Sequence, residues 1–89
     1  MSIFETAIME MGRQREYKDF APQEVVQWIF PQNWELFLDD LLAEVMELYR
    51  QDKIIVTLED KPVGKDHFPP KYDKVRIQVP KPFLKQKVG

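Results

Sequence analysis

The feature that most constrains this 89-residue chain is a long amphipathic segment at residues 34–49. Its apolar side chains recur at intervals of three and four residues, which is the periodicity of one helix face. They are Trp34, Phe37, Leu38, Leu41, Leu42, Val45, Leu48 and Tyr49. Asn33 precedes the segment and is a favoured N-cap residue. The sequence therefore predicts a helix of about four turns that packs this stripe against a core.

A shorter helix is predicted just before this segment. Pro22 suits a first helical position, where its missing N–H costs nothing, and the helix should end by Phe30 because a proline follows. We expect Val25, Trp28 and Ile29 to form its inward face. Only a short turn separates the two helices, so together they predict a helix-turn-helix, a motif that often binds DNA.

The rest of the chain adds a first helix and two strands. Ser2 fits the start of a capping box that begins a helix, and Gly12 is a residue type that commonly ends one. Residues 53–58 are rich in β-branched side chains and residues 75–79 alternate between apolar and polar, so both are predicted strands. Residues 59–74 contain three prolines and one glycine and are predicted to form a long loop.

A set of residues in a fixed order runs through these elements. It comprises Pro22, Glu24 and Val25 at the start of the second helix, Trp34 at the start of the third, Ile54 and Ile55 in the first strand, and Arg76 in the last. On these residues the chain resembles a family of small bacterial domains of unknown function with a winged-helix fold. The resemblance implies an α+β fold, with three helices followed by a two-stranded hairpin that carries a long wing, and it implies no activity. We therefore expect one winged-helix domain at residues 1–80 and a basic C-terminal tail at residues 81–89.

Acidic side chains occupy the predicted outer face of the third helix. They are Glu35, Asp39, Asp40, Glu44 and Glu47. Such a face should be repelled by the phosphates of a duplex. Three apolar residues are expected among the acids, and an apolar strip with a polar rim is typical of protein interfaces. We therefore predict a surface that binds a partner protein or a second copy, formed by Leu36, Asp39, Asp40, Ala43, Glu44, Met46 and Glu47.

Basic residues are concentrated in the second half of the chain. Residues 1–44 hold three basic and nine acidic side chains, whereas residues 45–89 hold ten basic and six acidic ones. Lysines interleaved with aromatic residues can bind nucleic acid through phosphate contacts and base stacking, although loop lysines also keep sheets from aggregating. The alternative function is a nucleic-acid-binding domain, with contacts from Lys61, Lys65, Lys71, Lys74, Lys81 and Lys85 in the wing and tail.

The composition argues against catalysis and against bound cofactors. The chain has no cysteine, one serine and one histidine, His67, so neither a zinc site nor a catalytic triad is indicated. Its three glycines are too scattered for a phosphate-binding loop. An enzyme would need a concave pocket around Asp66, His67 and Tyr72. We expect no catalytic residue, no metal, no cofactor and no small-molecule substrate.

The sequence also lacks the signals of a membrane or exported protein. No apolar run approaches the roughly 20 residues of a membrane span, and residues 1–13 lack the basic region that begins a signal peptide. The absence of cysteine is compatible with a reducing compartment. We therefore expect a non-catalytic module in the cytoplasm that does not contact the membrane.

Overall fold

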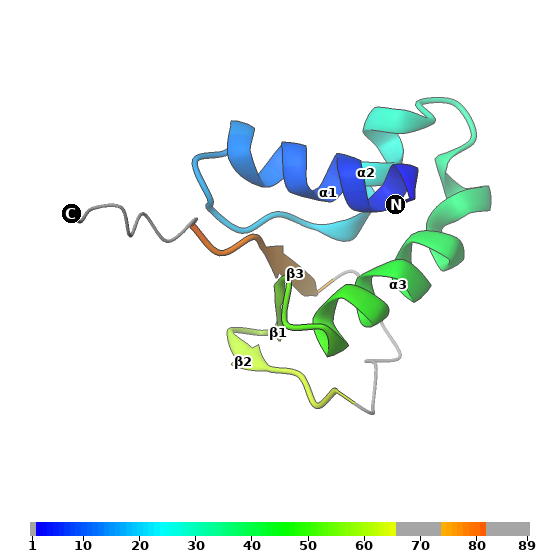
Figure 1. Cartoon of the computed structure of the whole chain (residues 1–89). Helices are drawn as coiled ribbons and strands as arrows, with labels where there is room; N and C mark the ends of the chain where they lie inside the picture. The colour runs from blue at the N-terminus through cyan, green and yellow to red at the C-terminus, as the bar shows by residue number, and fades with distance from the viewer. Residues whose placement is uncertain (1, 66–73, 82–89) are drawn as a thin grey trace.

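The computed structural model describes residues 2–65 and 74–81 as an α+β fold. Its elements in chain order are α1 (Ile3–Gln14), α2 (Pro22–Ile29), α3 (Trp34–Arg50), β1 (Ile55–Leu58), β2 (Lys61–Pro62) and β3 (Val75–Gln78). Figure 1 shows α1 and α2 above the strands, while α3 descends beside them to the level of β1. The predicted order of helices and of the two main strands is confirmed. None of the described helices is long and apolar enough to cross a bilayer.

The sheet has three strands in the order β2-β1-β3, not the two that the sequence predicted. The extra strand, β2, lies inside the segment predicted to be a loop, and Lys61 pairs with Leu58. Glu59 and Asp60 have positive φ angles of 52° and 69°, the conformation of a two-residue type I′ hairpin turn. This turn usually carries Asn-Gly, so a Glu-Asp pair gave no recognisable signal.

A short antiparallel bridge extends the sheet on its other side. Phe20, between α1 and α2, donates its N–H to the Ile77 carbonyl at 2.9 Å and accepts from the Ile77 N–H at 2.8 Å. Phe20 and Ile77 are both fully buried. The connection between the first two helices is therefore fixed to β3.

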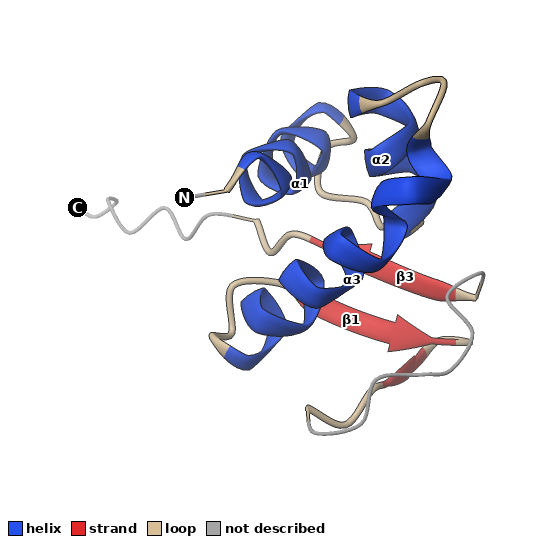
Figure 2. Cartoon of the chain, turned by 90° about the vertical axis from the view of Figure 1, so that its right-hand side faces the viewer, coloured by secondary structure: helices blue, strands red, loops and turns tan. Residues whose placement is uncertain are grey.

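Helix α3 crosses one face of the sheet, as Figure 2 shows. The core lies between that helix, the inward side of the sheet, and the packed faces of α1 and α2. Its fully buried large side chains include Ile8, Phe20, Val25, Val26, Leu41, Val45, Leu48, Val56, Val75 and Ile77. The predicted stripe of α3 does face inward, although Trp34, Phe37 and Leu42 are only partly buried.

Met46 belongs to the core, which contradicts its predicted place on the outer face. Only 7% of its surface is exposed. Met46 lies one turn after Leu42 and one turn before Tyr49, so it borders the apolar stripe in the helical lattice. The buried arc of α3 is therefore wider than predicted, and the outer face loses its largest apolar member after Leu36.

Trp28 faces solvent, although the sequence predicted it to be on the inward side of α2. Its exposed fraction is 46%, whereas Val25 and Val26 are completely buried. Because successive helical residues are rotated by about 100°, the inward direction lies between the two valines and about 110° from Trp28. Val26 thus takes the core position that the prediction gave to Trp28.

The ends of α1 and α3 differ in part from the predicted caps. The Oγ of Ser2 accepts the Glu5 N–H at 3.0 Å, which confirms Ser2 as the N-cap of α1. The Glu5 carboxylate is paired with Lys53 at 3.3 Å. Helix α1 does not end at Gly12 but continues to Gln14. Asn33 occupies the N-cap position of α3, but its side chain makes no capping hydrogen bond.

Candidate protein-interaction surfaces

The outer surface of α3, here called the α3 face, is formed by Glu35, Leu36, Asp39, Asp40, Ala43, Glu44 and Glu47. All of these residues are exposed except Glu44, which is half-buried. Leu36 has an exposed fraction of 76%, the highest of the exposed large apolar side chains in the described chain. The helix therefore presents one prominent apolar side chain next to several carboxylates, with Met46 removed from the predicted set.

Most carboxylates of the α3 face form no ion pair with the lysines and arginines that the structure describes. Glu47 is 3.5 Å from Arg50 and also accepts a hydrogen bond from Gln51. Within residues 2–65 and 74–81, no lysine or arginine forms an ion pair with any of the other four: Glu35, Asp39, Asp40 and Glu44. These four charges give the α3 face a negative potential that attracts cations and repels polyanions.

Two of the lysines predicted to bind nucleic acid are paired with carboxylates of the chain itself. Lys65 is paired with Asp52 and its Nζ lies 5.5 Å from the ring centre of Tyr49. Lys74 is 3.1 Å from Glu59. Lys61 and Lys81 are exposed and form no ion pair within the described residues. Lys71 and Lys85 lie outside the described residues.

An enzyme would need a pocket around three residues of the predicted wing. Asp66, His67 and Tyr72 all fall in residues 66–73, outside the described part of the chain. Among residues 2–65 and 74–81, no three acidic side chains are grouped so that they could hold a metal ion.

Two open hollows lie side by side between α1 and α2, and the sequence did not predict them. One has a volume of about 240 Å³ and is almost entirely apolar; it is lined by Ile3, Thr6, Ala7, Glu10, Trp28 and Ile29. The other has a volume of about 370 Å³ and is lined by Met11, Gln14, Arg15, Glu24, Gln27 and Trp28. Trp28 lines both. The sequence signal for an exposed Trp28 was the pair of consecutive valines, Val25 and Val26. If both valines are buried, helical geometry places Trp28 toward solvent.

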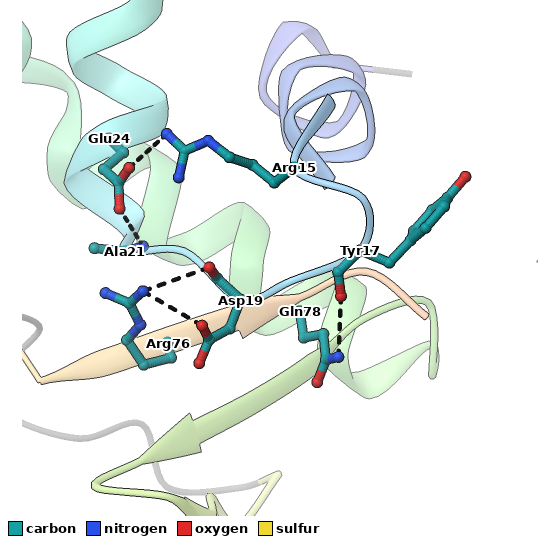
Figure 3. Close-up of polar contacts among 7 residues, drawn as sticks. All are labelled: Arg15, Tyr17, Asp19, Ala21, Glu24, Arg76 and Gln78. Carbon is teal, nitrogen blue, oxygen red and sulfur yellow. Dashed lines mark hydrogen bonds and ion pairs between the residues drawn. The ribbon is translucent and has the colours of Figure 1, made fainter. Parts of the chain in front are cut away.

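Arg15 and Glu24, which line the larger hollow, belong to the group of polar contacts drawn in Figure 3. Arg15 donates to one carboxylate oxygen of Glu24 at 2.6 Å, and the Ala21 N–H donates to the other at 2.9 Å. Arg76 of β3 reaches Asp19 at 3.4 Å. Burial raises the pKa of Glu24, but the Ala21 bond and the positive charges of Arg15 and Arg76 outweigh it and lower the pKa below 4.5. Glu24 therefore stays ionised and holds the start of α2 against the end of α1.

Comparison with models of known protein families, with curated proteins and with solved structures finds no match. The geometry of the surfaces described above is therefore the basis for any functional assignment.

Proposed function

We propose that this chain is a non-catalytic winged-helix module that binds another protein through the α3 face. The order of elements supports the winged-helix interpretation, because α2 and α3 follow each other closely and an antiparallel sheet comes next. In this interpretation the wing is the part of the chain that follows β1 and precedes β3. The resemblance to small bacterial domains of unknown function agrees with this topology.

The charge of α3 carries the functional part of the proposal. In a DNA-binding helix-turn-helix, the second helix enters the major groove and contacts phosphates and base edges. Here that helix presents four carboxylates that have no ion-pair partner within the described residues, beside the exposed Leu36. A partner that offers lysine or arginine around an apolar contact would complement this surface.

The test compares two pairs of charge-neutralising substitutions. Asp39→Asn with Asp40→Asn removes two charges from the α3 face, whereas Glu16→Asn with Asp60→Asn removes two exposed charges elsewhere. The control positions have positive φ angles of 58° and 69°, which asparagine tolerates better than most residues. Partners captured from a cell extract should be lost with the first variant and retained with the second. Equal capture by both variants would contradict the proposal.

The second candidate function is nucleic-acid binding through the wing and tail. The exposed Lys61 and Lys81, which have no ion pair within the described residues, support it. It requires binding that weakens steeply with added salt, because each phosphate contact releases counterions. A mobility shift of duplex or single-stranded DNA at low salt, lost with Lys61→Gln and Lys81→Gln, would favour this function over the first. No shift at low salt would reject it.

A further inference from the structure

We infer that the α1–α2 surface around Trp28 is the contact between two copies of this chain, related by a two-fold axis. This inference is independent of the proposed function, because no residue of the α3 face takes part. Two of the four large apolar side chains that are exposed in the described chain, Ile3 at 58% and Trp28 at 46%, line the same apolar hollow. Exposed tryptophan next to an apolar hollow is typical of the centre of a protein interface.

Trp28 of α2 faces a particular level of α1, and this level sets the position of the two-fold axis. The α1 residues that line the apolar hollow end at Glu10, and those that line the other hollow begin at Met11. Because Trp28 lines both, it lies opposite the boundary between these two residues. A two-fold axis close to this level would place the tryptophans of the two copies beside each other and would make the two α1 helices antiparallel.

The charges of α1 identify a second copy as the occupant. Glu10 and Arg13 are three residues apart and pair with each other on the exposed side of the helix. An axis at the level of residues 11–12 brings Glu10 of each copy opposite Arg13 of the other, and this level is about 1.5 Å from that of Trp28. When the α1 helices of two copies run antiparallel, the negative charge of each helix therefore faces the positive charge of the other. A partner surface that is only basic would be repelled by Arg13, and one that is only acidic would be repelled by Glu10.

Sedimentation of the full chain tests the contact directly. The wild-type protein should change from monomer to dimer between about 1 μM and about 1 mM, the range of a small interface. Trp28→Ala should raise the dissociation constant of the dimer about 30-fold or more, as expected for a central tryptophan. Leu36→Ala is the matched control, because Leu36 is even more exposed but lies on α3. It should leave the dissociation constant unchanged.

Charge reversal separates self-complementarity from simple hydrophobic association. Glu10→Arg alone and Arg13→Glu alone should each weaken the dimer about fivefold, because like charges then meet across the axis. The double variant Glu10→Arg with Arg13→Glu restores opposite charges and should recover the wild-type dissociation constant. A wild-type protein that stays monomeric at 1 mM would overturn the inference. A double variant no better than the single ones, or a dimer abolished by Leu36→Ala, would also overturn it.

Discussion

Val79 packs directly on the backbone of Gly12, so that a methyl group added at Gly12 would stand 2.4 Å from Cγ2 of Val79. This contact joins the end of the described chain to the last turn of its first helix. It also explains why a glycine is present within α1, where it weakens the helix. The predicted role of Gly12 as a helix end is wrong. The helix is ended instead by Glu16 and Tyr17, with φ angles of 58° and 66°.

Gly12→Ala should lower the free energy of unfolding by about 1–2 kcal/mol. Alanine is the better helix former by about 1 kcal/mol, but the overlap with Val79 costs more than this gain. In a Val79→Gly background the overlap disappears and the same substitution should become stabilising. Urea denaturation of the four proteins measures the coupling. A stabilising Gly12→Ala in the wild-type background would show that the two residues are not in contact.

Met46→Glu and Leu36→Glu test the orientation of α3. Met46 is 7% exposed and Leu36 is 76% exposed, so the first substitution buries a carboxylate and the second does not. We expect Met46→Glu to lower the unfolding free energy by about 3 kcal/mol or more, and Leu36→Glu to change it by less than about 0.5 kcal/mol. Thermal unfolding followed by circular dichroism is sufficient to separate them. Similar losses for both would mean that the helix is rotated.

Glu24→Gln should destabilise the protein in a pH-dependent manner. Burial opposes the ionisation of Glu24, but the Ala21 N–H, Arg15 and Arg76 lower its pKa below 4.5. A lowered pKa contributes stability above the pKa of the unfolded chain, and this contribution is lost as the pH falls through the folded pKa. The variant should therefore lose about 1 kcal/mol at pH 7 and less below pH 4.5.

Glu35→Gln is the control for that pH series. Glu35 is exposed and has no ion pair within the described residues, so its substitution should change the unfolding free energy by less than about 0.5 kcal/mol at either pH. Denaturation midpoints at pH 7 and pH 3 give the comparison. A Glu24→Gln penalty that grows as the pH falls would contradict the role assigned to the ionised carboxylate.

Tyr49→Phe should release the start of the wing from α3. The buried hydroxyl of Tyr49 donates to the Val63 carbonyl, which follows β2. Removing it leaves a buried acceptor without a partner and should cost about 1–2 kcal/mol of unfolding free energy. Tyr17→Phe is the matched control, because the Tyr17 hydroxyl makes no hydrogen bond within the described residues. Amide hydrogen exchange at Lys61 and at residues 63–65 should accelerate in the first variant only.

The sequence predicted those elements whose signals are local. The i, i+3, i+4 repeat from Trp34 to Tyr49 located α3, and the prolines at positions 22 and 31 limited α2. Alternation at residues 75–79 located β3 to within one residue. In each case the periodicity, or the restricted geometry of proline, is a property of the segment itself and needs no tertiary partner.

The missed features depend on contacts between distant segments. Gly12 is explained by Val79, which is 67 residues later in the chain. Strand β2 depends on a turn whose residues rarely adopt positive φ, so its composition did not reveal it. The apolar periodicity of α3 correctly placed the carboxylates on the outer surface of the helix. It wrongly placed Met46 there too, although Met46 lies at the edge of the buried stripe. The hollows beside Trp28 arise only when α1 packs on α2.

A photo-activated cross-linker at Ala43 tests the central claim most directly, because Ala43 lies exposed among the carboxylates of the α3 face. The matched control places the same group at Lys18, exposed in the loop after α1. Irradiation in a cell extract should join a polypeptide to residue 43 but not to residue 18, and Asp39→Asn with Asp40→Asn should abolish that product. A cross-link from residue 43 to nucleic acid, or no difference between the two positions, would contradict the account.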